Sequence, residues 1–132
     1  MPQKLYVLFL LLFSLNFGTA QENDNITTDI ELKTQQNNLI SISGVCHNNS
    51  SEIQNLNYSL NVQKISNTGS KSNNSQSGTF TIKPNENKTL STTTINFEAK
   101  DQTRVVLTVF NSMKIQVAQQ QKLLTIKDII KN

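Results

Sequence analysis

The chain is poor in the residues that build most catalytic and metal-binding sites. Its 132 residues include one cysteine, one histidine and no tryptophan. A single cysteine cannot form an intramolecular disulfide, and one Cys with one His cannot supply the four ligands of a zinc site. We therefore expect a fold that depends on its apolar core alone, with no metal and no cofactor.

Clusters of charge are missing as well. The chain carries 12 Lys and Arg against 9 Asp and Glu, for a net charge of +3, and its cations are scattered along the sequence. Nucleic-acid binding needs grouped cations that face the phosphates. The sequence therefore predicts no nucleic-acid partner.

Cys46 and His47 are neighbours and invite comparison with a nucleophile and its base. Adjacent residues of a strand point to opposite faces, and no third residue is available to orient the histidine. Asp29 and Glu31 share a strand face, but no second catalytic group can be assigned to them. We interpret Cys46 as a small buried apolar residue and the two carboxylates as solvation of an edge strand, and we expect no enzymatic activity.

The first 20 residues have the organisation of a secretory signal peptide. Lys4 precedes an apolar run over residues 5–13 that only Tyr6 interrupts, and residues 18–20 are small enough for a signal peptidase. The run is too short to span a membrane, and no nearby cysteine could carry a lipid anchor. We expect a mature protein that begins near Gln21, has no membrane anchor and lies outside the cytoplasm.

Apolar residues recur at every second position through most of the remaining chain, which is typical of half-buried strands. Leu56, Tyr58, Leu60 and Val62 alternate with polar residues. Residues 105–110 carry apolar side chains on both faces, which predicts a central strand. Seven strands are expected, around Ile30 with Leu32, Ile40 with Ile42 and Cys46, Leu56 to Val62, Phe80 with Ile82, Ile95 with Phe97, Val105 to Phe110, and Met113 with Ile115 and Val117.

Turn-rich breaks separate these strands at residues 47–52, 67–77, 84–88 and 100–103. Short strands at this spacing, with no crossover helix, predict an all-β fold, an immunoglobulin-like antiparallel β-sandwich of about seven strands. Gly44 falls inside the second strand and predicts a bulge or a close approach of the backbone.

We place the sandwich at residues 29–121. The polar residues 21–28 are expected to form a flexible N-terminal segment. Residues 122–132 form a C-terminal tail that suits a strand extension or a short helix, because Leu123, Ile126 and Ile130 fall on one helical face.

One part of the chain resembles a known family. A Ser/Asn-rich loop over residues 71–77 leads into the run Ser-Gln-Ser-Gly-Thr-Phe at 75–80, a turn follows at 84–87, and a Thr-rich strand starts with Leu-Ser-Thr at 90–92. This order is similar to the centre of the CsgH-type curli chaperones. The strand over residues 104–109 also fits, and the tail after Gln119 does not.

The resemblance implies an immunoglobulin-like sandwich in the periplasm that keeps the major curli amyloid subunit from polymerising before export, with no cofactor or nucleotide. The related CsgC-type chaperones carry a Cys-X-Cys motif. This chain has only Cys46, so a redox role is not implied. We expect a monomer whose partner is the major curli subunit.

Client binding is expected to be weak and distributed over a sheet face. Cations at strand ends and in loops suit an acidic or amide-rich client, and a planar guanidinium binds carbonyls or carboxylates with fixed geometry. Single lysines at such places also guard a strand against self-aggregation. The candidate client-binding residues are Arg104 first, then Lys64, Lys71, Lys83, Lys88 and Lys100.

A structural or adhesive immunoglobulin-like module of an exported surface assembly is the alternative. Subunits of this kind polymerise by donating a strand to a neighbour. Residues 21–28 would be the donor, but they are short and polar and lack alternating large apolar side chains. Oligomeric state separates the two hypotheses, because a chaperone stays monomeric at micromolar concentration and a fibre subunit does not.

Overall fold

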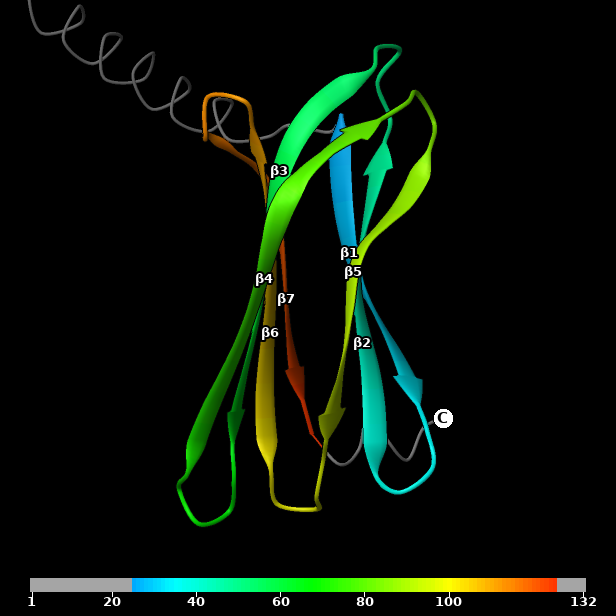
Figure 1. The fold of residues 1–132 in the computed structure, drawn as a ribbon. Helices are drawn as coiled ribbons and strands as arrows, with labels where there is room; N and C mark the ends of the chain where they lie inside the picture. Colours follow the sequence, from blue (N-terminus) through cyan, green and yellow to red (C-terminus); the bar gives the residue numbers. More distant parts are fainter. Residues whose placement is uncertain (1–24, 126–132) are drawn as a thin grey trace, which may run out of the picture.

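Residues 25–125, which the computed structural model describes, form two facing layers of antiparallel strands (Figure 1). The seven strands are β1 (Ile26–Thr34), β2 (Leu39–Asn48), β3 (Gln54–Ile65), β4 (Lys71–Ile82), β5 (Asn87–Asn96), β6 (Gln102–Asn111) and β7 (Gln116–Leu124). One sheet has three strands in the order β1-β2-β5, and the other has four in the order β4-β3-β6-β7. The predicted all-β immunoglobulin-like sandwich is confirmed.

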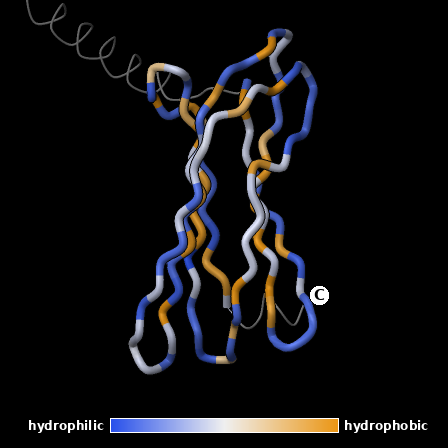
Figure 2. The backbone as a smooth tube through the Cα atoms, viewed as in Figure 1, coloured by the Kyte–Doolittle hydropathy of each residue, from blue (hydrophilic) through white to orange (hydrophobic). Residues whose placement is uncertain are grey.

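The alternation of apolar residues decides which face each strand turns inward. In β3, Leu56, Leu60 and Val62 are each at most 4% exposed, while the polar residues between them face outward. Hydrophobic and hydrophilic residues alternate along the strands in the same way in Figure 2, and the turn between β1 and β2 is hydrophilic. β6 lies between β3 and β7, as its apolar residues on both faces predict.

Gly44 lies both at a bulge and at a close approach of the backbone, the two features that its position in the strand predicts. The register between β2 and β5 shifts between Gly44 and Val45. A Cβ atom at position 44 would lie 3.1 Å from Cδ1 of Leu107 in the facing sheet. Leu107 is completely buried, so the two sheets approach each other here because residue 44 has no side chain.

Two segments that were expected to be irregular are strands. β1 begins at Ile26, whose side chain is buried, so the prediction of a flexible segment over residues 21–28 is wrong for residues 26–28. β4 begins at Lys71, so the loop predicted over residues 71–77 is also wrong. Those residues pair in register with residues 59–65 of β3, and this pairing outweighs the low strand propensity of Ser and Asn.

The strand expected around Met113 and Ile115 is instead a hairpin turn between β6 and β7. Asn111 Oδ1 accepts the backbone N–H groups of Met113 and Ile115 at 2.9 and 3.0 Å, and Lys114 has a φ of 64°. A side-chain amide that bonds to the following backbone stabilises a turn in this manner.

The chain continues in β7 as far as Leu124. The first residues of the predicted tail, 122–124, are therefore a strand extension and not a helix. The predicted signal peptide and residues 126–132 lie outside the described residues.

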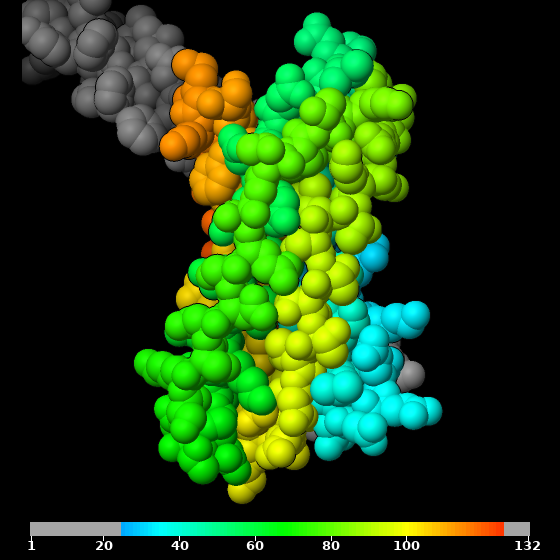
Figure 3. Space-filling model, in the orientation of Figure 1, coloured from blue at the N-terminus to red at the C-terminus, as the bar shows by residue number. Residues whose placement is uncertain are grey.

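The two sheets meet differently along their two sides. β1 lies against β7 and β6 on one side. On the other, the edge strands β4 and β5 run side by side, in green and yellow-green along the front of Figure 3. Asn74 Nδ2 donates to Thr93 Oγ1 at 3.1 Å, and Lys88 Nζ donates to the Thr81 carbonyl at 2.8 Å, so polar contacts link the sheets on this second side.

At one end of the sandwich, the completely buried side chain of Asn48 joins several segments. Its Nδ2 donates to the carbonyl oxygens of Glu52 (2.8 Å) and Ile82 (3.1 Å). Its Oδ1 accepts the backbone N–H (2.9 Å) and the hydroxyl (2.7 Å) of Ser50. Asn48 thereby connects the end of β2 in one sheet to the end of β4 in the other, and it fixes the connection that leads to β3.

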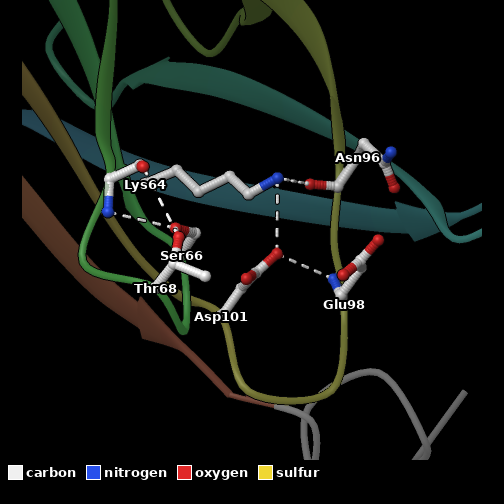
Figure 4. A network of polar contacts seen from close by, with 7 residues as sticks. Lys64, Ser66, Thr68, Asn96, Glu98 and Asp101 are labelled. Carbon is white, nitrogen blue, oxygen red and sulfur yellow. Dashed lines mark hydrogen bonds and ion pairs between the residues drawn. The ribbon is translucent and has the colours of Figure 1, made fainter.

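At the opposite end, Lys64 and Asp101 connect the sheets (Figure 4). Lys64 Nζ donates to the Asn96 carbonyl at 2.5 Å and lies 3.3 Å from Oδ2 of Asp101, which also accepts the N–H of Glu98 at 2.9 Å. The side chain of Asp101 is 4% exposed and that of Lys64 is 24% exposed. The Glu98 N–H lowers the pKa of Asp101, burial opposes this effect, and Lys64 again lowers it.

Gly44→Val is expected to lower the free energy of unfolding by about 1–3 kcal/mol, because its methyl groups must displace Leu107 from a packed core. Urea unfolding of the chain from Gln21 onward measures the change. Ser43→Val adds the same side chain on the outward face of the same strand, where a change below about 1 kcal/mol is expected. Equal losses for the two variants would contradict the close approach at Gly44.

Stability is expected to fall in acid through Asp101. Its pKa in the folded protein lies below the ordinary value of 3.8, so its charge stabilises the fold above that value, and the contribution is lost as the pH falls through the lower folded pKa. Asp101→Asn should be less stable than the parent at neutral pH, with a smaller decline between about pH 5 and pH 2. A variant that declines as steeply as the parent would count against this role.

Lys64→Met should remove about 1.5–3 kcal/mol of stability at neutral pH, because the buried Asp101 carboxylate then loses a charged donor. Lys71→Met is the control, since Lys71 is exposed at the start of the edge strand β4. Urea unfolding of both variants at one pH makes the comparison.

Candidate interaction surface

Amide and hydroxyl side chains make up most of the outer face of the four-stranded sheet, which we call the amide face, and Val106, Phe110 and Leu123 are apolar residues on the same side. They alternate along each strand with the residues that face the core. The members are Asn55, Asn57, Ser59, Asn61 and Gln63 of β3, Asn73, Ser75, Ser77, Thr79 and Thr81 of β4, Arg104 and Thr108 of β6, and Gln119 and Gln121 of β7.

Hydrogen bonds between neighbouring side chains order the amide face. Arg104 Nη2 donates to Gln121 Oε1 at 3.0 Å, Gln121 Nε2 to Gln119 Oε1 at 3.3 Å, and Gln119 Nε2 to Thr108 Oγ1 at 3.1 Å. Similar bonds link β3 and β4, where Ser75 donates to Asn61 at 2.9 Å. The bonds of the face run between neighbouring strands and, from Gln121 to Gln119, along β7, and they order its donors and acceptors.

Carboxylates are absent from the four strands that carry this face. β3, β4, β6 and β7 contain no Asp or Glu. The three-stranded sheet differs, because Asp29 and Glu31 are exposed on its edge strand β1. An acidic partner meets no like charge on the strands of the amide face, whereas β1 would repel it.

The six candidate client-binding cations do not gather on one surface. Arg104 on the interior strand β6 and Lys71 on the edge strand β4 lie on the outer side of the four-stranded sheet, in neighbouring cross-strand rows. Lys64 faces inward and is held by Asp101 and Asn96. Lys88 bonds to the backbone of β4.

Lys83 and Lys100 are exposed in the connections before and after β5. They stand at the two ends of the sandwich, so they border the sheets without lying on either face. Of the six, Arg104 and Lys71 are the two that share the amide face.

Cys46 and His47 point to opposite faces of β2, as expected. The Cys46 thiol is completely buried, and burial raises its pKa to about 11. His47 Nδ1 pairs with Asn87 Oδ1 at 2.5 Å on the outer face of the three-stranded sheet. Within residues 25–125, no three His, Cys, Asp or Glu side chains are grouped closely enough to hold a metal ion.

The amide face is the feature that the candidate residues did not anticipate. Its signal was present in the sequence as two long stretches, residues 54–82 and 102–124, that lack Asp and Glu while the rest of the chain carries them. Recognising it as one surface requires the strand order, because β3 and β6 are neighbours although they are distant in sequence.

No helix within residues 25–125 is long and apolar enough to cross a membrane. No family model and no curated protein sequence matches the chain. Solved structures match it by fold. The curli protein CsgC of E. coli superposes with a TM-score of 0.60 at 18% sequence identity, over 73% of this chain and 96% of CsgC.

Two further structures show how far the likeness extends. CsgH of R. palustris gives a TM-score of 0.57 at 17% identity, over 79% of this chain and 95% of CsgH. A β-glucuronidase of Bacteroides uniformis gives 0.55 at 14% identity over 76% of this chain, but only 14% of that enzyme is covered. The likeness to CsgC and CsgH spans nearly all of both proteins, and this chain has the CsgC/CsgH-like fold.

Proposed function

We propose that the protein is a periplasmic chaperone that inhibits premature amyloid polymerisation of the major curli subunit through weak contacts distributed over the amide face. The observation that supports this most directly is a carboxylate-free sheet surface of ordered amides and hydroxyls on a CsgC/CsgH-like sandwich. The predicted signal peptide supports the location, and no step of the activity needs catalysis.

The physical basis is competition with the client's own growth. An amyloid nucleus adds strands by matching rows of polar side chains and unpaired backbone groups. The amide face offers side-chain rows at the same strand spacing, about 4.8 Å. The backbones of β3 and β6 are each paired on both sides within the sheet, so a client strand that touches this face finds no backbone template on it for a further strand.

Charge sets the strength of the contact. Arg104, Lys71 and Lys114 contribute positive charge on this side of the sheet, and exposed charges interact weakly in salt. A chaperone must release its client for export, so weak contacts suit the task. Lys83 and Lys100 extend the positive charge to the ends of the sandwich.

The proposal is tested with amyloid-dye fluorescence of a purified major curli subunit, with the chain from Gln21 onward added at about one tenth of the client concentration. The expected result is a lag at least about twofold longer than with an unrelated sandwich protein, since few nuclei need to be contacted. An unchanged lag with several curli subunits, including one from the same genome, would reject the function and leave the fold unaffected.

Charge variants locate the active face. Asn61→Asp with Gln119→Glu adds two carboxylates to the amide face with little change of shape, and should remove at least about half of the lag extension. Ser41→Asp with Asn87→Asp adds the same charge to the three-stranded sheet and should leave the lag extension nearly intact. Arg104→Ala alone should reduce it by less than about twofold, because the contacts are distributed.

Oligomeric state tests the adhesive alternative. Residues 25–125 already form a complete sandwich in which β1 pairs with β2 along its length, so no strand from a neighbour is needed. Fibre subunits associate at about 10–100 µM, because association depends on concentration. Sedimentation of this chain over the same concentration range should show a monomer. A concentration-dependent polymer would favour the structural module instead.

A further inference from the structure

We infer that a groove in the amide face, between β4 and the β6–β7 hairpin, seats an extended peptide segment that carries an aromatic side chain beside a carboxylate. This inference rests on the proposed function, because it names the part of a client that the same face would hold. Three observations support the inference: the shape of the groove, the part-exposed ring of Phe110, and the positive charge of Lys114 in the same hollow.

The groove consists of two adjoining hollows along β3 and β4. One has a volume of about 400 Å³ and the other about 590 Å³, and both are lined by Asn57 and Thr79. Their floor runs from Asn55 to Ser59, a distance of about 13 Å at strand rise, which accommodates four or five residues of an extended chain. Floor side chains recur at every second residue, which matches the repeat of an extended peptide.

The hairpin between β6 and β7 forms the wall of the groove. It turns outward from the four-stranded sheet, in orange at the upper left of Figure 1. Asn57 Nδ2 donates to the Asn111 carbonyl at 3.2 Å, which fastens the hairpin to the floor. Asn111 Oδ1 in turn holds the backbone of Met113 and Ile115. The wall is therefore positioned by internal hydrogen bonds and requires no ligand to form.

Phe110 gives the groove its preference for an aromatic group. It lines the smaller hollow and is part-exposed on a face otherwise made mostly of short polar side chains. Because Phe110 is part-exposed in this hollow, part of its ring is open to a second ring. Aromatic pairs favour offset or edge-to-face geometry.

Lys114 gives the groove its preference for an adjacent negative charge. Lys114 lines the hollow together with Phe110, and its backbone has a φ of 64° in the hairpin turn. Neither the hairpin residues 112–115 nor the strands of the four-stranded sheet contain a carboxylate. A carboxylate that reaches Lys114 on a bound peptide would therefore pair with it without competition from those segments.

The test uses an acetylated and amidated hexapeptide of sequence Ser-Asn-Tyr-Asp-Asn-Ser, titrated to millimolar concentration into the isotope-labelled chain from Gln21 onward. Amide chemical shifts in the NMR spectrum should change at Asn57, Thr79, Phe110 and Lys114. A peptide with Ser in place of Tyr and one with Lys in place of Asp should each bind at least about threefold more weakly. Shift changes confined to another surface would overturn the inference.

Matched variants separate the groove from the rest of the face. Phe110→Ser should weaken binding of the hexapeptide about tenfold, because the ring contact is lost. Val106→Ser removes an apolar residue from the same side of the same strand, outside the groove, and should change it by less than about twofold. Lys114→Gln should weaken binding about threefold at low salt and Lys122→Gln should not.

The same variants in the amyloid assay keep this inference distinct from the proposed function. If the parent lengthens the lag and Phe110→Ser does so equally well, the groove is not the client's seat and the inference fails while the function stands. If the hexapeptide binds in the groove but the parent does not lengthen the lag, the chaperone function fails and the peptide site stands. A variant that loses both its NMR dispersion and its binding is replaced by Phe110→Leu, which keeps the apolar volume without the ring.

Discussion

The buried amide of Asn48 is the interaction on which the rest of the sandwich depends. An apolar core is non-directional, and it does not by itself fix how two sheets are placed relative to each other. The Asn48 side chain does this at one end, where it donates to the Ile82 carbonyl at the end of β4 in the facing sheet and bonds to Ser50 and Glu52 in the connection that leads to β3. Each such bond left unmade in a buried site costs about 1–3 kcal/mol, so this junction is the chain's substitute for a disulfide.

The junction at Asn48 and the ion pair of Lys64 with Asp101 lie at opposite ends, with the apolar clusters between them. Because both junctions lie at the ends of the sheets, the middle of the outer faces has no part in joining the layers. The outward residues in the middle of the strands, such as Ser59, Asn61 and Thr108, are therefore not needed to join the two sheets. This division of roles explains how a sheet face of amides and hydroxyls can coexist with a small core.

Much of the fold follows from period-two patterns that local sequence displays directly. Residues 56–62, residues 105–110, Cys46 and Gly44 all have the environments that the alternation predicts. The secondary-structure predictions are wrong where pairing with residues distant in sequence determines the conformation. Residues 71–77 have the composition of a loop, but they become a strand because β3 offers them a complete register.

The candidate interaction surface was also only partly predictable, because the partners of its residues are distant in sequence. Lys64 continues the inward parity of Leu60 and Val62, so its direction could have been read from the sequence. Its acceptors, Asp101 and the Asn96 carbonyl, lie more than thirty residues away, and only the folded chain brings them within reach. The bond between Arg104 on β6 and Gln121 on β7 also joins residues of different strands.

Lys88 and Lys64, which the sequence suggested as client contacts, protect the edges of the two sheets. Lys88 and Lys64 place their ammonium groups on the backbone carbonyls of Thr81 and Asn96, which belong to the edge strands β4 and β5. An edge carbonyl that already accepts a bond, with a positive charge beside it, is a poor place for another strand to join. These two ammonium groups therefore oppose the addition of a further strand at the edges β4 and β5.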